Sequence, residues 1–197
     1  MLVVSTYHHG NLREALVEVA VEIGREKGPD GIVLREVARR TGVSHNAAYR
    51  HFADRGALLQ AVAAVALEEM GAAIQARLRN VRGKDPADRA RRRLRANGQA
   101  YVEYALAEPG LFQVAFNNVS LEELSGPYDM LAAALDECRD TGWMAPEKRA
   151  GAELVCWSAA HGFAMLYGTG PLRGAPPAAR RADLARLLDR IEDGYRA

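Results

Sequence analysis

The sequence predicts an all-α fold with an N-terminal three-helix helix-turn-helix domain and a larger C-terminal helical domain, about nine helices in total. Apolar residues recur at helical spacing in every long segment, and Gly and Pro mark the breaks between these segments. In addition, residues 34–53, LREVARRTGVSHNAAYRHFA, have the pattern of two short helices joined by a Gly turn. A chain of 197 residues exceeds one average domain, which is consistent with a small head and a larger body.

The first predicted helix precedes this segment and ends at Gly28 and Pro29, a pair that stops helices. Its side chains at helical spacing are Leu12, Leu16, Val19 and Ile23. They give one apolar face that can pack against the helix-turn-helix.

Within residues 34–53, each position has a physical reason. Ala38 is small enough for a second helix to cross closely, and Gly42 can take a positive φ in the turn. Ser44 is a good N-cap, and Ala48 and Phe52 give the second helix an apolar underside.

The opposite side of this second helix is polar. His45 and Tyr49 form one row four residues apart, and Asn46 and Arg50 form another. This mixture of base-edge and phosphate donors is what a helix in the major groove of DNA requires. A helical hairpin with a merely solvated polar face is the alternative, but the residue types beside a Gly turn favour DNA binding.

Residues 7–65 resemble the N-terminal DNA-binding domain of the tetracycline-repressor (TetR) family of bacterial regulators, which leaves residues 66–197 as the regulatory and dimerisation domain. The resemblance is carried by YHHGNLR from Tyr7, the core at residues 34–53, and RGALL after Asp54. It implies that Tyr49 grips a phosphate and that Arg55 replaces the usual phosphate-binding Lys. The predicted DNA contacts are Arg35, Ser44, His45, Asn46, Tyr49, Arg50, His51 and Arg55. Val33 departs from the family, which commonly has a Ser or Thr cap there.

Helical patterns continue after residue 54. The predicted helices are residues 55–78, 86–107, a short one from 111, a turn or two from a capping box at 120–123, one ending at 141, one over 146–169, and a final one near 184–191.

Residues 157–162, WSAAHG, resemble the Trp-His-Gly signature of one C-terminal domain type in this family. The resemblance implies a pocket for a small-molecule inducer. The predicted lining is Tyr101, Tyr104, Phe112, Phe116, Met130, Trp157, His161 and Met165. The alternative, that Trp157 is a core residue and His161 a buried, hydrogen-bonded histidine, remains open.

The last two long helices carry small residues and an apolar row, which suit close helix packing. Together with the resemblance, this predicts a homodimer on a palindromic operator. The predicted interface is Ala160, Ala164, Leu184, Leu187, Leu188 and Ile191.

Net charge is +1, so any attraction to double-stranded DNA must be local. Residues 77–95 hold nine Lys and Arg against two Asp. This stretch lies far along the chain from the reading helix, so we favour a solvated face, paired with acids of the helix after Ser120, over a second nucleic-acid patch.

The sequence offers no assembled nucleophile and base, no phosphate loop and no metal-ligand spacing, so we expect neither an enzyme nor a cofactor. His8 and His9 have no third ligand nearby and are expected in an N-terminal arm. Two separated cysteines, no signal peptide and no apolar run of membrane length favour a cytoplasmic protein. An all-helical ligand-binding or scaffold protein without DNA binding is the alternative to a regulator.

Overall fold

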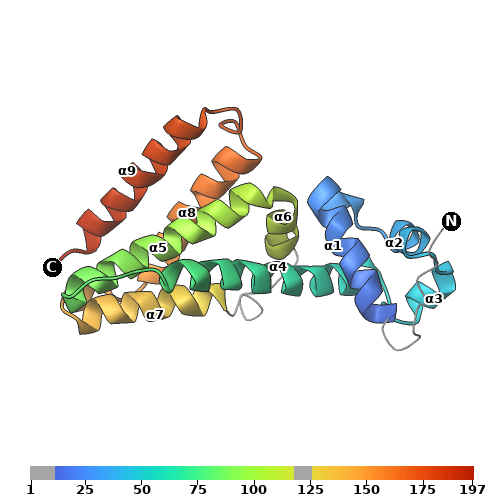
Figure 1. Cartoon of the computed structure of the whole chain (residues 1–197), viewed down its shortest axis with the longest axis horizontal. Coiled ribbons are helices and arrows are strands. Elements are labelled where there is room, and N and C mark those ends of the chain that lie inside the picture. Colours follow the sequence, from blue (N-terminus) through green and yellow to red (C-terminus); the bar gives the residue numbers. More distant parts are fainter. Residues whose placement is uncertain (1–11, 118–125) are drawn as a thin grey trace. The chain divides into compact units, whose positions relative to one another are not determined.

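The computed structural model describes residues 12–117 and 126–197, and within these ranges it contains nine α-helices (Figure 1). Their bounds are α1 (Leu12–Gly31), α2 (Leu34–Thr41), α3 (His45–Tyr49), α4 (Arg55–Leu78), α5 (Pro86–Ala107), α6 (Pro109–Asn117), α7 (Pro127–Asp140), α8 (Ala152–Gly168) and α9 (Pro177–Tyr195). The predicted N-terminal arm and the capping box at 120–123 lie outside the described residues.

The chain divides into two compact units. The first contains α1, α2, α3, α6 and the part of α4 up to Ala66. The second contains the rest of α4 together with α5, α7, α8 and α9. This division differs from a single split near residue 65 because α6 joins the first unit.

The core of the first unit is built on the apolar face of α1, where Leu16 and Ile23 are fully buried. At Gly28 the chain turns with φ 65° and ψ −167°, a conformation that suits Gly, and the helical run includes Pro29 beyond this kink. The helix α6 approaches α1 very closely. A Cβ atom on Gly110 would lie 2.2 Å from the carbonyl oxygen of Gly24, so only glycine fits at position 110.

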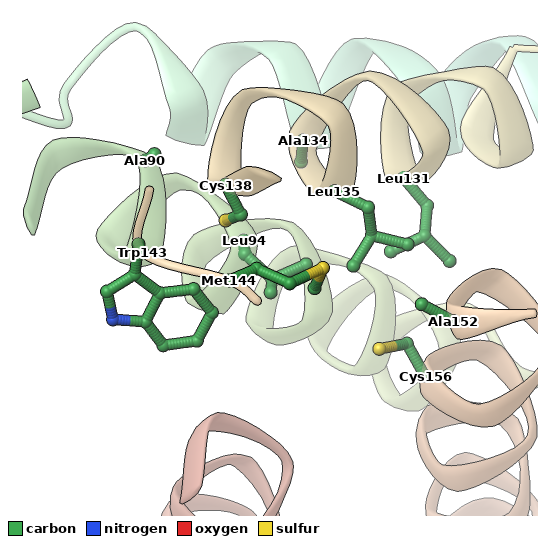
Figure 2. Packing of buried hydrophobic residues seen from close by; sticks show 10 residues of the cluster. All are labelled: Ala90, Leu94, Leu131, Ala134, Leu135, Cys138, Trp143, Met144, Ala152 and Cys156. Carbon is green, nitrogen blue, oxygen red and sulfur yellow. The ribbon is translucent and has the colours of Figure 1, made fainter. Parts of the chain in front are cut away.

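In the second unit, α5 is the central helix and packs against α7, α8 and α9. Figure 2 shows the core cluster between them, where Leu94 of α5 meets Leu135 of α7 and Cys156 of α8. Met144 follows α7 and is fully buried in the same cluster. The apolar residues of this cluster are thus covered by packing within one chain.

The start of α8 differs from the prediction. Pro146 begins only a short 3₁₀ turn, Pro146–Lys148, and α8 starts at Ala152. Gly151 has φ 74°, and this left-handed residue separates the turn from the helix. The prediction of one helix over 146–169 was therefore wrong at its N-terminal end.

The helix α4 is long and apolar enough, by length and composition, to cross a membrane. Half of its most apolar window is buried inside the structure, however. Leu58, Val62, Met70 and Ile74 have no exposed surface. Such burial is that of a core helix of a globular protein.

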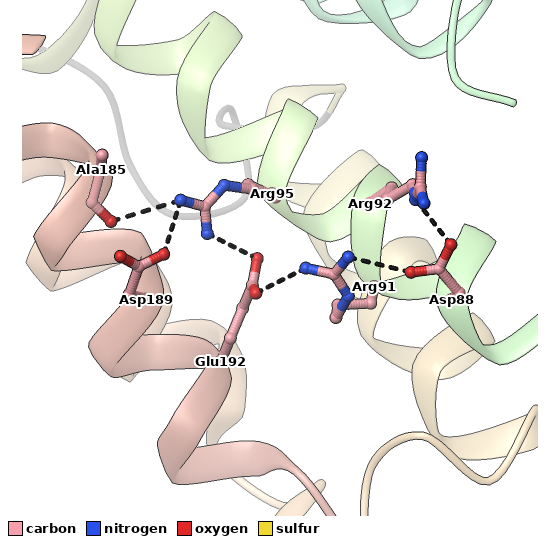
Figure 3. A network of polar contacts seen from close by, with 7 residues as sticks. All are labelled: Asp88, Arg91, Arg92, Arg95, Ala185, Asp189 and Glu192. Carbon is pink, nitrogen blue, oxygen red and sulfur yellow. Dashed lines mark hydrogen bonds and ion pairs between the residues drawn. The ribbon is translucent and has the colours of Figure 1, made fainter. Parts of the chain in front are cut away.

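The Arg-rich stretch is paired mainly with α9 (Figure 3). Glu192 accepts from Arg91 at 2.8 Å and from Arg95 at 2.9 Å, and Arg95 also reaches Asp189 at 2.7 Å. The acids predicted as partners, in the helix after Ser120, lie outside the described residues, and Arg93 pairs instead with Glu137 of α7 at 2.8 Å. The same network borders a polar pocket of about 420 Å³ beside Trp143.

Candidate functional site

The turn between α2 and α3 has the predicted geometry. Gly42 ends α2 with φ 77° and ψ 24°, and the Val43 N–H donates to the Ala38 carbonyl at 3.0 Å. The Ser44 hydroxyl accepts a hydrogen bond from the Ala47 N–H at 3.2 Å, as an N-cap does. Because Ala48 is fully buried beneath α3, the orientation of this short helix is fixed.

The outer side of this motif is open to solvent. The eight residues predicted to contact DNA are all exposed: Arg35, Ser44, His45, Asn46, Tyr49, Arg50, His51 and Arg55. Tyr49 is 46% exposed, and its ring meets that of His45 edge-on with centroids 4.6 Å apart. An exposed aromatic ring leaves apolar surface in contact with water. Such a ring suits a surface that is covered when a partner binds.

The basic residues at the end of α2 are engaged within the unit. Glu36 binds Arg39 at 2.8 Å and Arg40 at 3.0 Å, and Arg40 also reaches Glu26 of α1 at 2.8 Å. Hydrogen bonds from Arg39 and then Arg40 lower the pKa of Glu36 to about 2. The carboxylates of Glu36 and Glu26 therefore partly neutralise the positive charge of Arg39 and Arg40.

No described acid forms an ion pair with Arg35 or Arg50. Both side chains are exposed on the α2–α3 surface. They carry the positive charge that this surface offers to an anion such as a phosphate backbone.

Arg55 makes two hydrogen bonds inside the first unit. Its Nε donates to the carbonyl of Ile32 at 2.8 Å, and its Nη2 donates to the carbonyl of Pro29 at 2.6 Å. These bonds satisfy backbone acceptors between α1 and α2. Arg55 thus fixes the start of α4 to that connection, and its contact with a phosphate stays a prediction.

A chain of polar contacts lies inside the second unit. The indole Nε1 of Trp157 donates to the Tyr101 hydroxyl at 3.0 Å, and this hydroxyl lies 2.9 Å from Nδ1 of His161. Since an indole N–H can only donate, the tyrosine oxygen accepts from Trp157, and the same oxygen forms a hydrogen bond with the imidazole of His161. Burial lowers the pKa of His161, which favours the neutral imidazole.

Two matches cover most of the chain. The description "Bacterial regulatory proteins, tetR family" matches residues 16–62, and "Tetracyclin repressor-like, C-terminal domain" matches residues 94–191. The chain belongs to the TetR family. The first match contains the whole α2–α3 motif, and the second contains the Trp157–Tyr101–His161 chain.

Known proteins resemble the chain to different extents. The tetracycline repressor protein class C of Escherichia coli is 41% identical over 51 residues, which are 26% of this chain and 23% of that protein. A protein with unknown function from Rhodococcus sp. RHA1 is 30% identical, with a TM-score of 0.80 over 98% of this chain and 100% of that one. A variant of TetR from Acinetobacter baumannii AYE, in complex with minocycline, is 21% identical, with a TM-score of 0.65 over 92% and 94% of the two chains.

The residues predicted to line a TetR ligand pocket belong to both units. Tyr101, Trp157 and His161 meet in the second unit, and there the Tyr104 hydroxyl donates to Glu69 at 3.3 Å. Phe112 and Phe116 are neighbours on α6 in the first unit, with ring centroids 4.8 Å apart. Met130, on α7, is half-buried near Gly71.

Met165 is also among these predicted pocket residues. It is 39% exposed on the outer side of α8, away from the buried side of that helix. A side chain in this position covers the protein surface.

The predicted dimer residues lie mostly inside one chain. Ala160, Ala164, Leu184 and Leu188 are buried within the second unit, and Leu187 and Ile191 are half-buried. Ala160 and Ala164 let α8 pack closely in its own chain, and the contact of these residues with a second copy stays a prediction.

The exposed apolar side of α8 was missed. Leu154 is 63% exposed, Val155 56% and Leu166 46%, and Met165 lies beside them. The sequence could not single it out, because α8 is apolar on most of its circumference. We define Leu154, Val155, Met165 and Leu166 as the outer α8 face.

Proposed function

We propose that the chain is a cytoplasmic, DNA-binding transcriptional regulator that binds a palindromic operator as a homodimer and responds to a small molecule. The observation that carries the proposal is the orientation of α3. Its apolar underside, Ala48, is fully buried, while His45, Asn46 and Tyr49 are exposed. This is the arrangement of a recognition helix that enters the major groove.

DNA binding is tested by anisotropy titration of a labelled duplex from upstream of the chain's own gene. Tyr49→Ala should weaken binding to all duplexes, because it removes a phosphate contact, which carries no sequence information. Asn46→Ala should instead relax preference at particular base pairs by about 1–3 kcal/mol if its amide reads a base edge. Arg181→Ala, at an exposed position of α9, is the matched control.

Each result has a defined meaning. If Tyr49→Ala binds DNA with the affinity of the wild type, the phosphate contact of Tyr49 is contradicted. If Asn46→Ala loses affinity equally for all duplexes, Asn46 positions the protein on the DNA and does not read a base. If the folded wild-type chain binds neither its upstream duplex nor unrelated duplexes, the ligand-binding or scaffold alternative holds.

The dimer is proposed to form through the outer α8 face. Four apolar side chains exposed on one side of one helix form a patch of the kind that marks an interaction surface. A two-fold axis through this face brings each residue against the same surface of a second copy. Two α3 helices would then meet half-sites about 34–36 Å apart, or a multiple of that.

The dimer is tested with Leu154→Glu and light scattering after gel filtration. Burying a leucine contributes roughly 1.5–3 kcal/mol, and the loss occurs twice in a symmetric dimer, so dissociation should rise at least about 100-fold. Gln75→Glu adds the same charge at an exposed position of α4 and should leave the mass unchanged. A Leu154→Glu protein that stays dimeric at nanomolar concentration would contradict this interface.

The ligand response is proposed to involve the Trp157–Tyr101–His161 chain. Polar groups held among aromatic rings are typical of small-molecule sites. The A. baumannii relative in complex with minocycline supports ligand binding by this fold. Ligands that release the operator in the anisotropy titration should lose that effect when His161 is replaced by Phe.

A further inference from the structure

The Nδ2 atom of Asn97 is the one buried side-chain nitrogen or oxygen without a hydrogen-bond partner in the described part of the protein. Asn97 lies on α5, is 4% exposed, and no described residue offers an acceptor to its Nδ2. An unpaired buried amide costs about 1–3 kcal/mol, and native proteins rarely keep one without a reason.

The position of Asn97 connects it to the polar chain. It precedes Tyr101 by four residues, so the two side chains lie on one face of α5, one turn apart. On the other side of Asn97, Leu94 belongs to the apolar cluster of Figure 2. The amide therefore lies where the apolar core gives way to the aromatic and polar groups around Tyr101.

The residues around Tyr101 offer aromatic rings as well as hydrogen bonds. Trp157 donates to Tyr101, and Tyr128 of α7 meets the Trp157 ring edge-on with centroids 5.9 Å apart. Flat apolar groups pack well against such rings. An occupant beside Asn97 would thus be bordered by aromatic surface.

The nearby charges decide what kind of acceptor fits. Arg93, one turn before Asn97, is paired with Glu137 at 2.8 Å. Arg149 is paired with Glu153, one turn before Trp157, at 2.6 Å. With both arginines committed, a buried carboxylate would have no counterion from them and would be costly. A neutral carbonyl oxygen avoids that cost.

We propose that Asn97 is the hydrogen-bond donor for the carbonyl group of an uncharged aromatic ligand, held next to Tyr101 and Trp157. This rests on the proposed ligand response and adds to it the class of molecule recognised. Asn97 Nδ2 then gains in the bound state the acceptor that it lacks in the free protein.

The test compares three molecules of one shape: 2-acetylnaphthalene, 2-naphthoate and 2-ethylnaphthalene. Their binding to the full chain is measured by calorimetry and by the rise in melting temperature, without DNA. The ketone should bind at least about tenfold more tightly than the other two, the worth of one hydrogen bond. Asn97→Leu should lose this preference and, when unliganded, melt no lower than the wild type, because it removes an unsatisfied group of similar size.

Asn80→Leu is the matched control, since Asn80 is exposed and already donates to the Ala76 carbonyl. It should bind the ketone like the wild type. The proposal is overturned if the wild type does not bind the ketone or binds naphthoate equally well. It is also overturned if Asn97→Leu keeps the preference for the ketone, which would mean that the amide only holds a water molecule. A large loss of stability in Asn97→Leu would overturn it as well. A chain that binds the ketone but no operator would refute the regulator and leave this assignment standing.

Discussion

Replacement of Gly110 by Ala tests the contact between α6 and α1. The added Cβ would lie 2.2 Å from the Gly24 carbonyl oxygen and 3.1 Å from that of Arg25. Both are backbone atoms, so no side chain can rotate away, and α6 must retreat by about 1 Å to restore ordinary contact. Overpacking of this kind costs roughly 1–3 kcal/mol, and contacts with backbone atoms place it in the upper part of that range, above the helix-propensity gain of at most about 1 kcal/mol from Gly to Ala.

For a chain of this length, the loss corresponds to a fall of about 3–10 °C in melting temperature. Thermal unfolding followed by circular dichroism measures it, and hydrogen exchange should show faster exchange in α1 and α6. Gly194→Ala makes the same chemical change on α9, where an added Cβ meets no atom within 4 Å, and should not lower the melting temperature. If Gly110→Ala melts within about 1 °C of the wild type, the close approach of the two helices is refuted.

Four further changes have defined outcomes. Ser44→Ala should destabilise the first unit by about 1 kcal/mol through loss of the α3 cap, seen in chemical denaturation, and Thr at this position should restore it. Arg55→Met should cost about 1–3 kcal/mol by leaving two carbonyls without their donor, an effect that a purely DNA-contacting residue would not show. Leu135→Ala, at a fully buried position, should cost about 2–5 kcal/mol in urea unfolding. Burial lowers the pKa of His161 below its ordinary 6.5, so the unfolded chain takes up the proton first and stability falls as the pH drops below about 6.5. His161→Gln should flatten the melting temperature between about pH 5 and 7 relative to the wild type, and an unchanged slope would exclude that histidine as its source.

The helix-turn-helix was predictable because its determinants are local. Gly42 supplies the left-handed turn, Ser44 caps the next helix within three residues, and Ala48 lies on the only face that can be covered. The role of Arg55 was not predictable in the same way. Its partners are backbone carbonyls 23 and 26 residues upstream, and backbone acceptors leave no side-chain signature in a sequence.

The faces of α8 show where sequence patterns stop being informative. This helix is apolar nearly all round, so both its inner residue Ala160 and its outer residue Leu154 satisfy a helical repeat. Periodicity identifies the helix but does not say which side its own chain covers. The structure decides this, since Ala160 is buried and Leu154 is 63% exposed. The sequence did not indicate Asn97 for the same reason. Whether a polar side chain is buried and unpaired depends on the residues that surround it in the fold.

The pairing of α5 with α9 determines how shortened versions of this protein would behave (Figure 3). The terminal helix acts as a built-in counterion, because Asp189 and Glu192 neutralise Arg91 and Arg95. A fragment cut before Pro177 would leave the guanidinium groups of Arg91 and Arg95 without these carboxylates and would uncover the face of α5 against which α9 packs. It would also lose Leu184 and Leu188, which are buried in the full chain. A shortened version should therefore be less stable than the full chain, because it loses ion pairs and buried apolar contacts together.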